Sequence, residues 1–150
     1  MARRLGRRAV LLTSQPAQLP RTLPPGVRHF GFVPLSRLLP RAAAIVPHGG
    51  MGTLGQALAA GVPQMTVPVM LDQFDNSRRL LRLGVSANLR ASAYRPDQVT
   101  RVLQNLLHSP AVTERCRHYA ERCRRENAFV TACEALEQLH GRRDCRTLID

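Results

Sequence analysis

The strongest constraint on the fold is an alternation, between residues 9 and 107, of short apolar runs with segments whose apolar residues recur at helical spacing. Apolar runs bounded by proline, glycine or arginine are typical of buried strands. They predict strands at residues 9–14, 27–32, 42–47, 64–69 and 86–89. Because strands that alternate with helices pair in parallel, we expect an α/β domain with a doubly wound, Rossmann-like parallel sheet covered on both faces.

Helices are expected between these strands and after the last of them. The spacing of apolar residues predicts helices at residues 36–41, 50–60 and 75–83, and Gly61 and Gly84 provide the expected stops for the last two. From Pro96 onward the helical register continues, so the C-terminal segment is expected to form one amphipathic helix and then one or two more over residues 112–139. In a sheet of this kind, ligands bind beyond the carboxyl ends of the strands.

Length and charge narrow the class of protein. The 150 residues are expected to form a single domain, 1–150, and no apolar run is long enough for a membrane span, so we predict a soluble, cytoplasmic protein without stable membrane insertion. The net charge of +12 comes from arginine without any lysine. With only two tyrosines and four phenylalanines, the sequence lacks the basic and aromatic pattern of single-strand binders, so nucleic acid is not expected as a partner.

Metal chemistry is not expected either. The four cysteines form no C-x-x-C pair and fall in segments predicted as helix, so neither a zinc site nor a disulfide framework is indicated. The sequence also contains no Asp-x-Asp pattern that would hold a divalent cation beside a phosphate. We therefore predict no metal and no cofactor.

The most informative segment is PHGGMGT at residues 47–53, between a predicted strand and a predicted helix. Its glycines allow a ligand to approach the backbone, and the first amides of the following helix point outward, unpaired, at the positive end of the helix dipole. These features predict a phosphate site, to which a His48 N–H and the Thr53 hydroxyl would add hydrogen bonds. Taken alone, a glycine-rich turn is more often only a tight turn, and this one matches neither G-x-G-x-x-G nor a Walker loop.

Together with the sequence around it, this loop resembles the donor signature of family 1 glycosyltransferases. The resemblance covers residues 30–89 and is carried by GFVP at 31–34, HGGMGT at 48–53, ALAAGVPQ at 57–64, Pro68 and DQFDN at 72–76. It implies the C-terminal, donor-binding lobe of the two-lobed GT-B fold, as in UDP-glycosyltransferases and the macrolide glycosyltransferases of bacterial natural-product pathways. Such enzymes transfer a sugar, with inversion, from a UDP- or TDP-sugar to a small-molecule acceptor.

The resemblance also implies roles for single residues. Diphosphate contacts are expected from His48, Gly50, Gly52 and Thr53, base and ribose contacts from Phe32, Val33 and Gln56, and sugar contacts from Asp72 and Gln73. Two positions depart from the pattern. Gln56 stands where many members have glutamate, and Leu35 replaces a glutamine, so the ribose contacts are expected to be weaker than in the family.

The sugar contacts have a chemical reason and an alternative. A carboxylate accepts hydrogen bonds from two hydroxyls, whereas an amide both donates and accepts. The alternative for Asp72 is a helix N-cap, with Gln73 merely exposed. Asn76 is interpreted as bracing the loop, and Asp75 is left out of the site because it has the same cap ambiguity.

The resemblance further implies that two parts of such an enzyme are missing from this chain. In the family, the catalytic base belongs to the N-terminal acceptor lobe, and the donor lobe opens with a strand, a loop and a helix ahead of the strand matched by residues 9–14. We therefore expect the chain to bind donor, to contain no catalytic residue and to be inactive alone.

Three origins of the chain stay open: a fragment of an ordinary enzyme, the donor subunit of a two-chain enzyme, and a truncated reading frame. The alternative function is a non-catalytic nucleotide-binding or protein-interaction module, because a sheet without its first strand exposes an edge.

Overall fold

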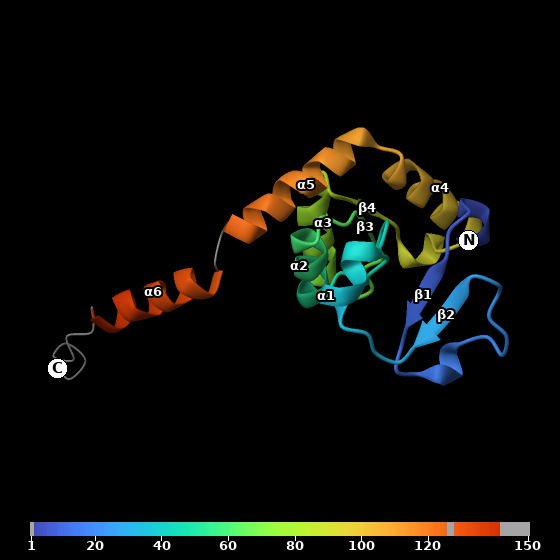
Figure 1. Cartoon of the computed structure of the whole chain (residues 1–150), viewed down its shortest axis with the longest axis horizontal. Coiled ribbons are helices and arrows are strands. Elements are labelled where there is room, and N and C mark those ends of the chain that lie inside the picture. The colour runs from blue at the N-terminus through green and yellow to red at the C-terminus, as the bar shows by residue number, and fades with distance from the viewer. Residues whose placement is uncertain (1, 126–127, 142–150) are drawn as a thin grey trace.

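The computed structural model describes residues 2–125 and 128–141 and has an α/β arrangement with two short parallel sheets (Figure 1). In the first sheet, β1 (Ala9–Leu12) pairs with β2 (Val27–Phe30). In the second, β3 (Gln64–Thr66) pairs with β4 (Ser86–Asn88). The parallel pairing agrees with the predicted fold class, but the strands are shorter than expected and the sheet is divided into two parts.

Helices follow the strands in the order that the sequence predicts. They are α1 (Leu35–Leu38), α2 (Met51–Ala59), α3 (Gln73–Leu83), α4 (Pro96–Leu107), α5 (Pro110–Arg125) and α6 (Ala128–Gly141), with 3-10 turns η1 (Ala2–Leu5), η2 (Pro16–Gln18), η3 (Leu39–Arg41) and η4 (Ala91–Ala93). Gly61 after α2 and Gly84 after α3 have φ angles of +69° and +75°. These left-handed glycines are the predicted helix stops.

Residues 42–47 do not form a strand, although their apolar run predicts one. Ile45 is the one bridge residue: its N–H donates to the Pro63 carbonyl at 3.0 Å, and its carbonyl accepts from the Met65 N–H at 2.9 Å. In the described part of the chain, no strand pairs with the opposite side of this segment. The segment runs beside β3, and the Val67 N–H also donates to the Pro47 carbonyl at 2.9 Å, but only Ile45 forms a bridge. The apolar pattern alone therefore overestimates the extent of the sheet.

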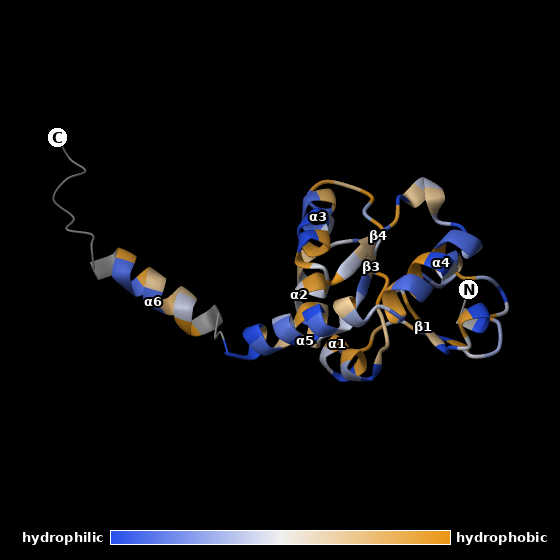
Figure 2. Cartoon of the chain, turned by 90° about the horizontal axis from the view of Figure 1, so that it is seen from above, coloured by the Kyte–Doolittle hydropathy of each residue, from blue (hydrophilic) through white to orange (hydrophobic). Residues whose placement is uncertain are grey.

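Three apolar clusters hold the helices against the second sheet. Figure 2 shows β3 and β4 between α4 on one side and α2 and α3 on the other. In the first cluster, the fully buried Met65 of β3 packs against Val99, Leu103 and Leu106 of α4. The second cluster contains Leu54, Leu80, Val85 and Cys116, and the third contains Leu39, Ala57 and Val62. Full burial of such a side chain stabilises a fold by about 1.5–3 kcal/mol, so α2 and α3 are firmly anchored.

The first sheet is not covered in the same way. Val10 and Leu12 of β1 and Phe30 of β2 are about two-fifths exposed, at 41%, 40% and 41%. The prediction that helices cover both faces is therefore wrong for β1 and β2. The Ala9 N–H donates to Gly26, just before β2, and the Thr13 N–H donates to Phe30 of β2. The backbone groups of Val10 and Leu12 therefore lie on the outer edge of β1, where the described residues provide no paired strand.

The C-terminal helical segment consists of two helices with different surroundings. α5 packs on α2 and buries Cys116 and Ala120, whereas α6 extends away from the rest of the chain and leaves Leu136 and Leu139 exposed (Figure 1). No helix among the described residues is both long and apolar enough to cross a membrane.

Candidate functional site

The predicted phosphate loop leads directly into α2. Gly50 is the N-cap residue, and its carbonyl accepts hydrogen bonds from the N–H groups of Thr53 and Leu54, each at 3.1 Å. The N–H groups of Met51 and Gly52 have no acceptor in the part of the chain that the structure describes. These two amides lie at the positive end of the helix dipole, which is the arrangement that binds an anion. Thr53 can contribute its hydroxyl, because its amide is already bonded.

His48 lies over this loop with an exposed ring. A Cβ atom added to Gly50 would be 2.6 Å from the His48 Nε2, so the absence of a side chain at Gly50 is what allows the imidazole to lie there. No described residue forms a hydrogen bond with the ring. His48 also lines an open cavity of about 280 Å³ with Val67 and Tyr94. The ring nitrogens are therefore available to a ligand at the loop.

The glycines of the loop have different roles, which the sequence alone does not separate. Gly49 has a φ of +106°, and a Cβ there would lie 3.0 Å from both the Gln73 carbonyl oxygen and the Ser77 Oγ. Gly49 thus lets the loop pack directly on α3. A Cβ at Gly52, in contrast, would meet no atom within 4 Å. Gly52 therefore leaves open space next to an unpaired amide, where a ligand can approach.

The predicted sugar contacts begin α3. Asp72 is at the N-cap position, but its side chain forms no capping hydrogen bond, so the N-cap alternative is wrong for that side chain. The Asp72 Oδ2 instead accepts from the Asn76 Nδ2 at 2.8 Å, and the same Nδ2 donates to the Gly49 carbonyl at 3.2 Å. Asp75 hydrogen-bonds Arg79 at 2.7 Å, and this guanidinium lowers the pKa of the Asp75 carboxyl. Asp75 is thus occupied outside the site.

Gln73 has a defined structural role as well. Its Oε1 accepts hydrogen bonds from the N–H groups of Val69 and Met70, at 2.9 and 3.2 Å. These bonds hold a turn in which Leu71 has a φ of +49°, a conformation that non-glycine residues rarely adopt. The interpretation of Gln73 as merely exposed is therefore wrong. Because both lone pairs of the carbonyl are used, the amide can only donate to a ligand.

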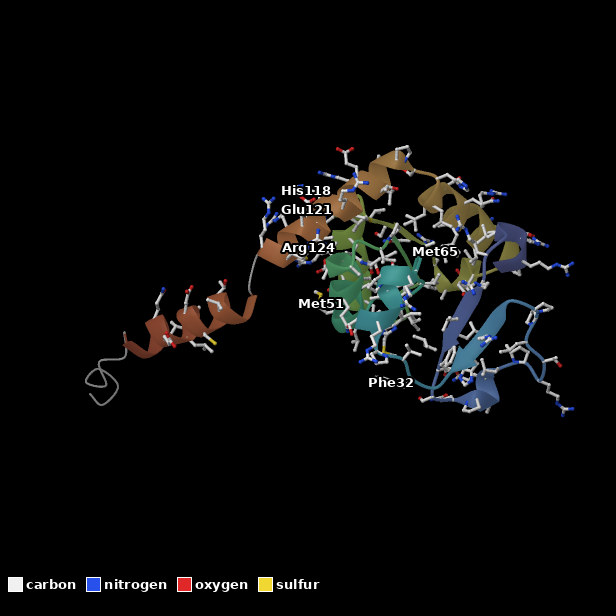
Figure 3. The ribbon with its side chains drawn as sticks, viewed as in Figure 1. Phe32, Met51, Met65, His118, Glu121 and Arg124 are labelled. Atoms are coloured by element: carbon white, nitrogen blue, oxygen red, sulfur yellow. The ribbon has the colours of Figure 1, made fainter. Side chains whose placement is uncertain are left out.

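Phe32 and Val33, the predicted base contacts, lie at the carboxyl ends of β1 and β2. They line an open cavity of about 550 Å³, and Phe32 is 82% exposed in the connection between β2 and α1 (Figure 3). The remaining lining residues are Leu12, Thr13, Ser14, Gln15, Gln18, Gly31 and Leu35. The loop 13–18 was not among the predicted site residues. The sequence does indicate it, because the loop follows the carboxyl end of a predicted parallel strand, where ligands bind.

Gln56, the predicted ribose contact, lies one turn into α2. Its Nε2 donates to the Gly52 carbonyl at 3.3 Å, so the side chain folds back along the helix toward the phosphate loop. The segment that follows Phe32 and Val33, the proposed base contacts, is held beside this helix by packing of Leu39 against Ala57. The structure therefore brings His48, the glycine loop and Asp72 into one hydrogen-bonded and packed group. Phe32 and Val33 form a separate group with the loop 13–18.

Known proteins with similar sequences settle which family has this arrangement. The family model described as "Erythromycin biosynthesis protein CIII-like, C-terminal domain" matches residues 8–136. The chain belongs to this family. It is 39% identical over 129 residues to an aclacinomycin-T 2-deoxy-L-fucose transferase of Streptomyces galilaeus, covering 80% of this chain and 28% of that protein. It is 41% identical over 102 residues to the elloramycin glycosyltransferase ElmGT of Streptomyces olivaceus, covering 68% of this chain and 25% of the relative.

Solved structures of other glycosyltransferases agree with the fold. The glycotransferase of kitacinnamycin is similar over 87% of this chain and 34% of its own length, with 28% identity and a TM-score of 0.79. The glycosyltransferase VinC, solved in complex with dTDP, is similar over 69% of this chain and 26% of its own, with 34% identity and a TM-score of 0.64. The chain thus spans about a quarter to a third of the length of these relatives. The fold is that of the C-terminal lobe of GT-B glycosyltransferases.

Proposed function

We propose that this EryCIII-like domain binds a UDP- or TDP-sugar as the donor half of an inverting, metal-independent glycosyltransferase. The observation that carries the proposal is the pair of unpaired amides at Met51 and Gly52, beside open space and an uncommitted His48 ring. A diphosphate fits such a site because amides, a helix dipole and an imidazole N–H all favour negative charge. The Met51 and Gly52 amides and the His48 ring can together offset the charge of the diphosphate without a cation.

The other parts of the donor are proposed to extend on either side of this diphosphate site. The base and ribose are assigned to the cavity lined by Phe32 and Val33, with Gln56 on the ribose side. The sugar is assigned to Asp72 and Gln73, which lie against the phosphate loop through Gly49. The dTDP bound to VinC supports thymine as one candidate base, and the sugar and acceptor stay open.

In the proposed reaction, an acceptor oxygen forms a bond to the anomeric carbon while the bond from that carbon to the diphosphate oxygen breaks. The acceptor proton passes to a base outside this domain, and the Met51 and Gly52 amides stabilise the charge on the departing diphosphate. We propose that a further lobe or partner subunit holds the small-molecule acceptor and the base. The domain alone is then expected to bind donor without transferring it.

Titration calorimetry with thymidine and uridine diphosphates, with and without a chelator, tests the binding. We expect micromolar to millimolar affinity that does not change when divalent cations are removed. Binding that requires a metal contradicts the cation-free site. Transfer is tested with the purified domain, a TDP-sugar and a panel of phenolic, sterol and macrolide acceptors. Glycoside formation that is lost in Asp72→Ala would refute the proposal that this domain is inactive alone.

A second candidate function is a protein-interaction module. It is favoured by the open outer edge of β1 and by the exposed Val10 and Leu12 on that strand. A folded domain that binds neither nucleotide would favour this function over donor binding.

A further inference from the structure

One buried amide connects two parts of the candidate site that are far apart in the sequence. Asn76 is only 7% exposed on α3, and its Nδ2 donates both to the Gly49 carbonyl at 3.2 Å and to the Asp72 Oδ2 at 2.8 Å. A primary amide has two N–H groups, so this side chain can satisfy both acceptors at once. Gly49 belongs to the phosphate loop and Asp72 to the sugar end of the site.

We propose that Asn76 is a positioning residue that couples the diphosphate and sugar contacts of the donor site. The inference rests on the proposed function, since it assigns a ligand to each end of the Asn76 bridge. Both N–H groups of Asn76 are used inside the protein, so this side chain cannot donate a hydrogen bond to the ligand. Its effect is to fix the direction of the Asp72 carboxylate relative to the phosphate loop.

The close packing around Gly49 makes this bridge short and rigid. Gly49 lies so near α3 that a Cβ would come within 3.0 Å of the Gln73 carbonyl oxygen. The backbone N–H of Asn76 also donates to the Asp72 carbonyl at 2.9 Å, so the bridging residue is fixed to the first turn of its own helix. A movement of the phosphate loop is therefore transmitted through Asn76 to Asp72, and the reverse also holds.

The bridge restricts the rotamers that the Asp72 side chain can occupy. An exposed carboxylate at the start of a helix is free to occupy several rotamers, and ordering it at the moment of binding costs entropy. With Oδ2 held by Asn76, the remaining oxygen lone pairs keep one orientation toward the sugar. Asn76 thus orders the sugar contact before the ligand arrives, as a supporting residue does in other binding sites.

The test compares two ligands that differ only in the sugar: thymidine diphosphate and thymidine-diphosphate glucose, with the uridine pair measured in parallel. Calorimetry gives the ratio of the two affinities, which isolates the sugar contribution. In Asn76→Ala we expect this ratio to fall by about tenfold, the size of one lost hydrogen bond to a charged group. Asn76→Ser, which is smaller but still polar, is the second variant if the alanine variant does not fold, and a loss in the same direction is expected.

Ser77→Ala is the matched control. Ser77 lies on the same helix, is fully buried beside Gly49, and its Oγ has no hydrogen-bond partner among the described residues. The substitution changes packing at this contact without removing the bridge, so the affinity ratio should stay as in the wild type. Equal weakening of both ligands in the Asn76 variants, with the ratio unchanged, would show a purely structural role and overturn the inference while leaving the proposed function intact. Absence of binding by the wild type would instead overturn the proposed function and the inference with it.

Discussion

The two sheets of this domain differ in how firmly they hold the residues assigned to the ligand. Around β3 and β4, buried apolar clusters fix α2 and α3, and the phosphate loop is packed and hydrogen-bonded to the start of α3. Around β1 and β2, the apolar side chains remain partly exposed and the cavity next to Phe32 is open. The residues proposed to contact the diphosphate and the sugar therefore lie on well-packed elements, whereas the proposed base contacts lie on exposed ones.

The largest expected difference between the two regions is in stability. Met65→Ala removes the fully buried side chain at the centre of the α4 cluster and should lower the free energy of unfolding by about 2–5 kcal/mol. Leu11→Ala, at a 36% exposed position of β1, is the matched control and should cost less than about 1 kcal/mol. Urea unfolding followed by circular dichroism measures both. Similar losses at the two positions would mean that β1 is as well packed as β3.

The two kinds of glycine in the phosphate loop provide the next test. Gly49→Ala places a Cβ against backbone at a positive φ and should destabilise the fold by about 1–3 kcal/mol. Gly52→Val meets open space, so the domain should remain folded, but its branched side chain should block the approach of a diphosphate and abolish binding. Thermal unfolding and nucleotide titration separate these effects. A Gly52→Val variant that still binds nucleotide would show that the phosphate lies elsewhere.

Affinity should also differ between the two regions. His48→Ala removes a donor to the diphosphate and is expected to weaken nucleotide binding by about 1.5–3 kcal/mol with little change in stability. Phe32→Ala, in the open cavity, removes only an exposed aromatic contact and should weaken it by about 0.5–1.5 kcal/mol. Calorimetry on both variants provides the comparison. Unchanged affinity together with a large loss of stability in His48→Ala would assign that histidine to packing.

A pH dependence of stability is also expected from the well-packed region. Burial raises the pKa of the Cys116 thiol to about 11, above its ordinary value of 9.0. The unfolded chain then releases this proton at lower pH than the folded domain, so Cys116 contributes stability below pH 9 that is lost as the pH rises toward 11. The free energy of unfolding, measured from pH 9 to 11, should decrease in the wild type and in Cys123→Ala, which changes an exposed cysteine and serves as the control. This decrease should be smaller in Cys116→Ala.

The order of the elements could be predicted because hydrophobic periodicity is a local property of the sequence. The helix that begins at Met51, within the PHGGMGT segment, and the stops at Gly61 and Gly84 follow from such local signals. The length of the strands, and the single bridge in place of a strand at residues 42–47, could not be predicted, because they depend on how regularly distant segments pair.

Some features of the candidate site could likewise be predicted from the sequence and others could not. The position of the glycine loop between a buried segment and a helix was evident from the sequence, and the ligand contacts of the nine assigned residues remain predictions. The interpretation of Asn76 as bracing the loop is confirmed by its hydrogen bond to the Gly49 carbonyl, but this partner could not be derived, because it lies 27 positions away and no periodicity links the two residues. The commitment of the Gln73 carbonyl to Val69 and Met70 was also missed, since it depends on the left-handed turn at Leu71.

The two hydrogen bonds that the Gln73 carbonyl accepts within the protein affect which sugars the proposed site would distinguish. A side chain that can only donate forms a hydrogen bond with an oxygen whether or not that oxygen carries a hydrogen. Gln73 could therefore donate equally to a hydroxyl, a ketone or a methyl ether. The Asp72 carboxylate has the opposite property, because it only accepts and therefore requires a hydroxyl. If both residues contact the sugar as proposed, oxidation or O-methylation should be tolerated at the carbon facing Gln73 and rejected at the carbon facing Asp72.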